Sequence, residues 1–170
     1  MKKPNSKRLM SLFISFTMIF TLSVTTSLAQ EKVKITGKRY GVSTKTEVIK
    51  HDDTEGHVLI LTEAKGFDVI TNEQFISREF MDYVKGNGTH RGYQKDITPE
   101  GDVVFATFEG KTTTTLSPEG KPLTTFEGTF SFTRGTGKYE NIHGGGTYKG
   151  KVIGEGMFTY DWEGESFIKK

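Results

Sequence analysis

Four side chains that can bind ligands or transfer protons lie close together after a Gly-Asn-Gly turn at residues 86–88. They are His90, Arg91, Tyr93 and Asp96, on a segment that we expect to form a β-strand. Side chains of a strand alternate between its two faces. His90 and Asp96 therefore share one face, and Arg91 and Tyr93 share the other. A face that lines the mouth of a barrel could orient a small ligand with a polar end. The alternative is a set of cross-strand pairs on a solvated face.

Two aromatic residues near the C-terminus complete the candidate site. Tyr160 and Trp162 alternate with the acidic residues Asp161 and Glu163, so both rings point to the side that we expect to be buried. The predicted ligand-binding residues are thus His90, Arg91, Tyr93, Tyr160 and Trp162. No residues are predicted to be catalytic. The chain has no phosphate-binding P-loop, no dinucleotide fingerprint and no G-x-S-x-G nucleophile motif.

The densest cluster of metal-ligand side chains spans residues 51–57, where His51 and His57 flank three acidic residues. Imidazole and carboxylate groups can together hold zinc or a harder divalent ion. A strand followed by a turn, however, places neighbouring side chains on opposite faces, and Gly56 marks such a turn. We therefore predict a polar hairpin here, with no metal site, and we predict no cofactor.

Residues 1–29 have the pattern of a secretory signal peptide. Four basic residues come first, residues 9–30 carry no charge, and small residues at Ser27 and Ala29 suit a signal peptidase. We predict cleavage after Ala29 and export to the periplasm or the extracellular space. The alternative is an uncleaved membrane anchor, because the uncharged stretch is nearly long enough to span a bilayer.

The charge and cysteine content of the remaining chain exclude several functions. All 21 acidic residues but only 19 of the 23 basic ones follow residue 29, which gives the mature chain a formal charge of −2. It lacks the basic surface that nucleic-acid binding requires, so no nucleic-acid partner is expected. The absence of cysteine excludes thiol catalysis, disulfides and a lipid-modified cysteine. We expect no stable membrane insertion after signal cleavage, and a homo-oligomer is compatible with the sequence.

Alternating apolar and polar residues predict strands throughout residues 30–170. Residues 125–133 and 158–163 place aromatic rings on one face and Thr, Glu, Asp or Ser on the other. We expect Phe126, Phe130, Phe132, Phe158, Tyr160 and Trp162 to be buried and Thr125, Glu127, Thr129, Thr159 and Glu163 to be exposed. Three aromatic-Glu-Gly triplets, at residues 108–110, 126–128 and 162–164, are interpreted as an inward ring, an outward acid and a glycine that lets the strand bend.

Turn signals recur every ten to twenty residues, and all 20 glycines lie within residues 30–170. They predict a single all-β domain over residues 30–170, with about eight antiparallel strands in a closed or nearly closed barrel. Closure is favoured because it removes exposed strand edges. We expect Gly-rich hairpins and at most one short helical turn, near residues 138–142.

Residues 135–148, Gly-Thr-Gly-Lys-Tyr followed by a Gly-Gly-Gly-Thr-Tyr strand start, resemble a hairpin of the allene oxide cyclase-like and dirigent-like small β-barrels. Residues 56–59, 88–93 and 100–102 also resemble uncharacterised exported bacterial barrels. The resemblance covers about a third of the mature chain and implies the fold. No catalytic residues of those families fall on matching motifs here.

Three functions are compatible with such a domain. The first is an exported barrel that binds a small apolar or amphipathic ligand in its interior. The second is a cyclase or isomerase-type enzyme that uses the interior, and the third is a cell-envelope interaction protein with exposed Thr-rich strands. The sequence favours a non-enzyme, because the inward faces look mainly apolar whereas an enzyme should bury ionisable groups.

Overall fold

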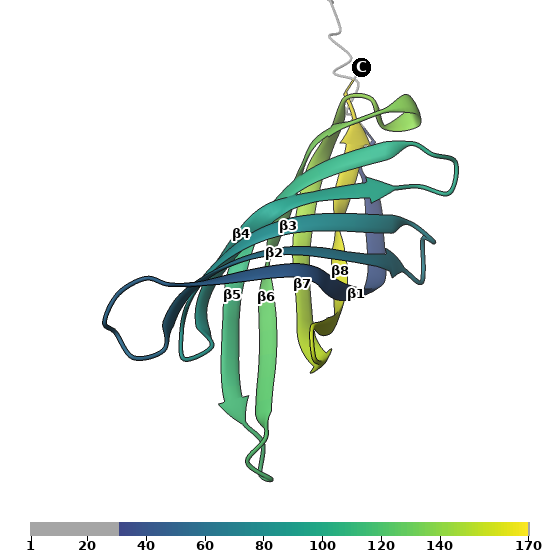
Figure 1. Ribbon diagram of the computed structural model, residues 1–170. Helices are drawn as coiled ribbons and strands as arrows, with labels where there is room; N and C mark the ends of the chain where they lie inside the picture. Colours follow the sequence, from purple (N-terminus) through teal and green to yellow (C-terminus); the bar gives the residue numbers. More distant parts are fainter. Residues whose placement is uncertain (1–30, 170) are drawn as a thin grey trace, which may run out of the picture.

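The computed structural model describes residues 31–169, and the predicted signal peptide, residues 1–29, lies outside them. Eight antiparallel strands follow one another around a closed barrel (Figure 1). They are β1 (Val33–Lys50), β2 (His57–Asp68), β3 (Gln74–Val84), β4 (Asn87–Ile97), β5 (Val103–Leu116), β6 (Pro122–Gly135), β7 (Ile142–Gly154) and β8 (Met157–Ile168). Each strand pairs with the next, and β8 closes the barrel by pairing with β1. The predicted all-β, eight-stranded barrel is confirmed.

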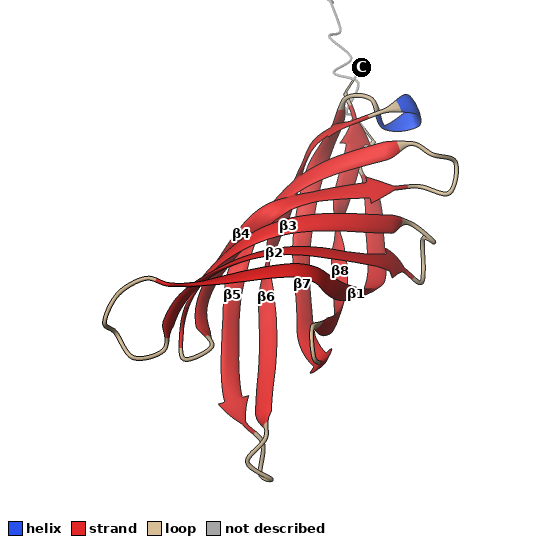
Figure 2. Cartoon of the chain, in the orientation of Figure 1, coloured by secondary structure: helices blue, strands red, loops and turns tan. Residues whose placement is uncertain are grey.

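The one short helical turn predicted from the sequence is also present. It is a 3-10 turn, η1 (Gly137–Tyr139), in the connection between β6 and β7 (Figure 2). Across residues 31–169, no helix is long and apolar enough to cross a membrane.

The connections alternate between the two ends of the barrel (Figure 1). The terminal end carries the start of β1, the end of β8 and the loops at residues 69–73, 98–102 and 136–141. The opposite end carries the loops at residues 51–56, 85–86, 117–121 and 155–156.

The loop at residues 69–73 contains no glycine or proline, so no turn was predicted there. Its turn is made by a side chain: the carboxylate of Asp68 accepts hydrogen bonds from the backbone N–H groups of Ile70 and Thr71, at 2.9 and 3.1 Å. Asn72 then takes a left-handed backbone conformation, with φ of 58°. Asp and Asn are suited to these two tasks, because Asp mimics a backbone turn and Asn tolerates positive φ.

The aromatic rings alternate with polar residues as predicted, but their burial is only partial. Phe126, Phe130, Phe132, Phe158, Tyr160 and Trp162 are half-buried rather than buried. Glu127, Thr129 and Glu163 are exposed as expected, whereas Thr125 and Thr159 are half-buried. The rings remain partly accessible because they border an internal cavity instead of filling a solid core.

Inward-facing glycines make room for the rings on neighbouring strands. A Cβ atom at Gly92 would lie 2.6 Å from the ring of Phe108, and one at Gly150 would lie 2.5 Å from the ring of Phe126. Either distance is far below a normal van der Waals contact. The glycine of an aromatic-Glu-Gly triplet acts in the same way, because a Cβ at Gly110 would lie 2.8 Å from a tyrosine hydroxyl. The glycines thus have a packing role that the sequence pattern did not reveal.

Candidate ligand-binding cavity

The barrel encloses a cavity of about 660 Å³. Most of its wall is apolar, and the phenylalanines that line it are Phe75, Phe108, Phe126, Phe130, Phe132 and Phe158. Its lining also includes residues from the loops at both ends, such as Tyr139 at the terminal end and Gly156 at the opposite end. Two polar clusters and one isolated carboxyl group interrupt the apolar wall.

The first cluster, the Arg39 cluster, consists of Arg39, Asp68, Glu73 and Asp96 with the polar side chains around them. Nε of Arg39 donates a hydrogen bond to Oδ2 of Asp68 at 3.3 Å. Nη1 lies 3.1 Å from Oδ1 of Asp96, and Nη2 lies 3.6 Å from Oε2 of Glu73. Arg39 is 5% exposed, Asp68 0% and Asp96 4%. Every nitrogen of the guanidinium therefore contacts a carboxylate of the protein.

Asp68 is held by further donors. The indole N–H of Trp162 donates to Oδ2 of Asp68 at 2.7 Å, and the backbone of the 69–73 loop donates to Oδ1. Burial opposes ionisation of Asp68, but these hydrogen bonds and Arg39 outweigh it and hold the pKa of the carboxyl below its ordinary value. The guanidinium carbon of Arg39 also lies 4.9 Å from the centroid of the Trp162 ring, a cation–π distance.

The Arg39 cluster contains more acidic groups than basic ones, and the pKa values of its other two carboxyl groups reflect this. Burial raises the pKa of Asp96, and burial together with the charge of Asp96 raises that of Glu73, although Arg39 opposes both shifts. The amide of Gln94 donates to both carboxylate oxygens of Asp96, at 2.9 and 3.2 Å. The hydroxyl of Tyr160 donates to Oε1 of Gln94 at 3.0 Å. The one cation is thus shared among three acids.

The second cluster, the His90 cluster, consists of His90, Thr112, Tyr83 and Tyr148. Nδ1 of His90 lies 3.0 Å from the hydroxyl of Thr112, and Nε2 lies 2.7 Å from the hydroxyl of Tyr148. The Thr112 hydroxyl is in turn 2.7 Å from that of Tyr83. Each hydroxyl can donate or accept, so the chain of hydrogen bonds is satisfied with the proton on either ring nitrogen.

The His90 cluster is electrically neutral at physiological pH. Burial lowers the pKa of His90 to about 4, and His90 is 4% exposed. Burial also raises the pKa of Tyr83 to about 12 and that of Tyr148 above its ordinary value. The cluster therefore offers a ligand hydroxyl and imidazole groups but no charge.

Glu79 is the isolated carboxyl group. It faces inward from β3, lines the cavity and is half-buried. Among residues 31–169 its carboxyl group has no hydrogen-bond or ion-pair partner, and burial raises its pKa to about 8. Burial thus favours the protonated carboxyl of Glu79 over its carboxylate when the cavity is empty.

The structure separates the five predicted ligand-binding residues into two groups. His90, Tyr160 and Trp162 line the cavity, as does Asp96, which shares the face of His90. Arg91 and Tyr93 lie on the outer face of the barrel. There the guanidinium of Arg91 lies 5.6 Å from the ring centroid of Phe80, and Tyr93 is 72% exposed. The candidate site therefore contains His90, Tyr160 and Trp162 but not Arg91 or Tyr93, and ligand contact by the first three remains a prediction.

Several cavity residues were not singled out from the sequence. They are Arg39, Glu73 and Glu79, together with Asp68, which is bonded to Arg39 beside the cavity. The interior therefore buries more ionisable groups than we expected, because the sequence predicted mainly apolar inward faces. On β3 the period-two signal is absent, because Phe75 and Met81 face inward while Ile76 and Phe80 face outward. Only the register of β3 with its neighbours shows that Glu79 points into the barrel.

The residues considered for metal binding form a surface cluster at the opposite end. His57 is bonded through both ring nitrogens, with Nδ1 3.0 Å from Asp52 and Nε2 2.9 Å from Asp82. The rings of His51 and His57 lie 5.2 Å apart, closer than the strand alternation led us to expect. No group of three or more His, Cys, Asp or Glu side chains in the described part of the chain is placed to hold a metal ion. The absence of a metal site remains a prediction.

The closed eight-stranded barrel has the fold of dirigent-like small β-barrels, as the sequence resemblance implied. The fold is shared with the solved structure of the pterocarpan synthase dirigent protein GePTS1 at 8% sequence identity. The match has a TM-score of 0.51 and covers 88% of this chain and 96% of that one. No protein-family profile matches the sequence, and no curated protein is detectably similar to it.

Proposed function

We propose that the protein is an exported barrel that binds a small, mainly apolar ligand in its interior. The observation that carries this proposal is the cavity of about 660 Å³, walled by aromatic rings and interrupted by a few polar groups. Small-molecule sites in proteins have this character, with volumes of roughly 300–1,000 Å³ and a small number of orienting polar groups. Apolar surface of the ligand would be removed from water, which provides the driving force.

The aromatic wall is held open by the backbone rather than by mobile loops. Closed hydrogen-bonded pairing fixes all eight strands, and inward glycines make room for several of the rings, among them Phe108 and Phe126. A preformed cavity avoids much of the entropy that ordering a binding site on association would cost. This supports binding by a site that exists before the ligand arrives.

Binding is tested with N-phenyl-1-naphthylamine, a neutral apolar dye that becomes fluorescent in apolar surroundings. Trp162 is the single tryptophan of the chain and lines the cavity, so a dye that enters should quench its emission by energy transfer. We expect saturable dye fluorescence with parallel quenching of Trp162. Dye fluorescence without quenching would place the dye elsewhere and contradict the proposal.

A matched pair of variants locates the binding. Ala106 is buried on β5 and lines the cavity, whereas Thr113 is exposed on the outer face of the same strand. Ala106→Phe should fill part of the cavity and weaken dye binding by about tenfold or more, that is by ~1.4 kcal/mol. Thr113→Phe places the same ring outside and should leave dye binding unchanged.

A cyclase or isomerase-type enzyme is the second candidate, because the cavity holds ionisable groups that a purely apolar carrier does not need. Neutral His90 and protonated Glu79 could in principle exchange protons with a bound molecule. Native mass spectrometry of the exported protein separates the two candidates. A co-purified ligand that is unchanged after incubation with fresh protein supports binding, and one that is converted supports the enzyme.

Export belongs to the proposal and is supported by the pattern of residues 1–29. The exported protein should begin at Gln30 or within two residues of it, which N-terminal sequencing measures. An intact Met1 in the membrane fraction would replace cleavage by an anchor.

A further inference from the structure

We propose that the ligand carries a protonated amine and that Glu79 is the group that receives it. This inference rests on the proposed binding function and adds the chemical class of the ligand. It follows from the charge balance of the cavity and from the position of Glu79 along its wall.

The interior has too few cations for its acids. Among the described residues, the interior holds one guanidinium, that of Arg39, and four carboxyl groups in or beside the cavity. Arg39 contacts three of these, Asp68, Glu73 and Asp96, and the fourth is Glu79. With all of them ionised, the formal charge of this interior set would be −3. Lys34 is the other basic residue of the lining, and it is exposed near the start of β1 at the terminal end. A cationic ligand would reduce this imbalance, whereas an anionic ligand would increase it.

Arg39 is not free to neutralise Glu79. All three guanidinium nitrogens contact carboxylates of the Arg39 cluster, at 3.1 to 3.6 Å. The ionisable groups of the His90 cluster do not neutralise it either, because His90, Tyr83 and Tyr148 are all uncharged at neutral pH. Within residues 31–169 Glu79 therefore has no cationic partner, and a ligand is the group that can supply one.

Glu79 and the ring of Phe108 both line the cavity, on either side of Gly92. The cross-strand partner of Glu79 on β4 is Gly92, and Gly92 pairs on its other side with Phe108 of β5. Because Gly92 has no side chain, the ring of Phe108 lies over it, next to the position of Glu79. A carboxylate beside an aromatic ring suits an ammonium ion, which forms an ion pair with the first and a cation–π contact with the second.

The position of Glu79 also fits an amphipathic amine. It lies along β3 between Phe75, which packs near Arg39, and Tyr83, which belongs to the His90 cluster. The ammonium group would thus be held partway along the cavity, and the apolar part of the ligand would contact the phenylalanine wall. Formation of the ion pair requires ionised Glu79, so binding at neutral pH should release a proton to solvent.

The experiment compares three probes of equal chain length, decylamine, decanol and decanoate, as competitors of N-phenyl-1-naphthylamine below their aggregation concentrations. At pH 7 we expect decylamine to bind about tenfold or more tightly than decanol, and decanoate to bind most weakly. Decanol binding equal to that of decylamine, or a preference for decanoate, would overturn the inference while leaving the binding function intact. Failure of the dye itself to enter the cavity would instead overturn the proposed function.

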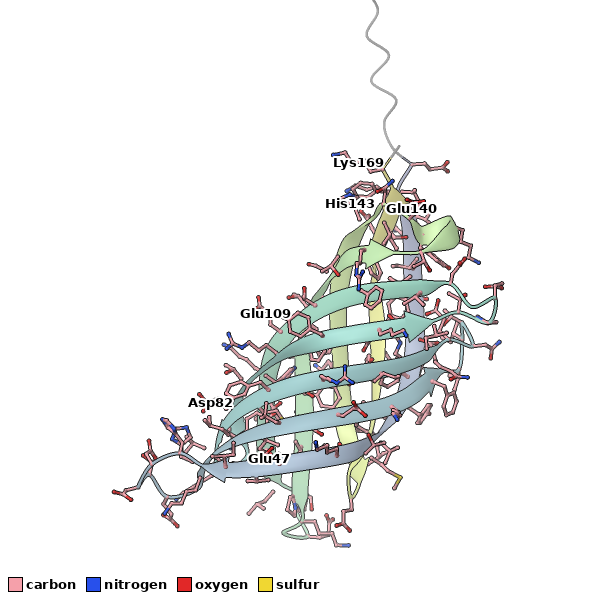
Figure 3. All side chains as sticks on the ribbon, turned by 45° about the horizontal axis from the view of Figure 1, so that its top comes forward. Glu47, Asp82, Glu109, Glu140, His143 and Lys169 are labelled. Atoms are coloured by element: carbon pink, nitrogen blue, oxygen red, sulfur yellow. The ribbon has the colours of Figure 1, made fainter. Side chains whose placement is uncertain are left out.

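A variant pair tests whether Glu79 is responsible. Glu79→Gln keeps the shape of the side chain but removes its charge, and the preference for decylamine over decanol should fall to about threefold or less. Glu109→Gln is the control, because Glu109 is exposed on the outer face of β5 (Figure 3), and the preference should be retained. An unchanged preference in Glu79→Gln would contradict the assignment.

Calorimetry provides a second measurement that does not depend on comparing affinities. Binding of decylamine to the wild-type protein at pH 7, measured in buffers of different ionisation enthalpy, should release a proton from Glu79, up to about one per site. Decanol should release none, and decylamine should release none from Glu79→Gln. Proton release from Glu79→Gln equal to that from the wild-type protein would show that Glu79 is not the receiving group.

Discussion

The Arg39 cluster and the stretch of wall that holds Glu79 and His90 bury polar groups in opposite ways. In the first, one guanidinium is surrounded by carboxylates, indole and amide groups, all contributed by the protein. In the second, the imidazole is neutral within a chain of hydroxyl groups, and the carboxyl group of Glu79 has no partner among the described residues. Both regions belong to the same cavity, and both are built from inward positions of strands.

The difference separates polar groups that hold the barrel together from polar groups that are available to a ligand. Arg39 links β1 to the ends of β2 and β4 and to the 69–73 loop, so its charge is used internally. The side chain of Glu79 bonds to no other strand among the described residues, and burial disfavours its ionised form. A costly group without a structural partner is a stronger indication of function than a buried charge as such.

The largest expected effect comes from breaking the Arg39 cluster. Arg39→Met leaves the buried carboxylates of Asp68 and Asp96 without their cation and should lower the unfolding free energy by about 3–5 kcal/mol. Chemical denaturation at pH 7 measures this. Arg78→Met is the matched control, because Arg78 pairs with Glu63 on the surface and is 75% exposed in its side chain, so a loss of under ~1 kcal/mol is expected. Equal losses would show that the Arg39 cluster is not structural.

The next largest effect is the pH dependence of the unfolding free energy that arises from His90. The folded pKa of His90, about 4, lies below its unfolded value of 6.5. Its contribution to stability is therefore present above pH 6.5 and is lost as the pH falls toward 4. The stability advantage of the wild-type protein over His90→Gln should shrink by about 3 kcal/mol between pH 7 and pH 4, at ~1.4 kcal/mol per pH unit. An advantage that is independent of pH would mean that His90 can be protonated in the folded barrel.

The contribution of Glu79 to stability should depend on pH with the opposite sign. Its folded pKa of about 8 lies above the unfolded value of 4.5, so its contribution favours folding below pH 4.5 and is lost as the pH rises through 8. Glu79→Gln should therefore stabilise the empty barrel at pH 9 by about 2 kcal/mol, less than the full shift implies because the carboxyl group faces the cavity. At pH 4.5 the variant and the wild type should unfold at similar denaturant concentrations. A loss of stability at pH 9 would indicate that Glu79 has a structural partner.

The smallest effect is expected outside the cavity, at His57. Hydrogen bonds to Asp82 and Asp52 raise the pKa of this half-buried imidazole, so its contribution to stability is present at low pH and is lost as the pH rises through its folded pKa. His57→Gln should produce no resolved change in the thermal midpoint at pH 8, and a chelator should produce none in the wild-type protein. A midpoint that drops with chelator, and does not drop in a His51→Ala, His57→Ala double variant, would reveal a metal site.

The fold was largely predictable because its determinants are local. Turn residues with positive φ, such as Gly56, Gly86, Gly101 and Gly120, stand where the hairpins turn, and the aromatic alternation of β6 and β8 is visible in the sequence. The loop at residues 69–73 was missed because its turn depends on the carboxylate of Asp68 rather than on glycine or proline. The candidate site was predictable only in part, since His90, Tyr160 and Trp162 lie on clearly alternating strands whereas Glu79 does not.

The sequence by itself determined the class of structure, the direction of most aromatic rings and the absence of cysteine chemistry. These follow from alternation, turn residues and composition, which act over a few residues along the chain. Only the tertiary structure decided that the rings border a cavity, that Arg39 is shared by three acids and that Glu79 is left without a cation. Those properties depend on strand register and on distances between residues as far as 123 positions apart, as between Arg39 and Trp162, and no local pattern specifies them.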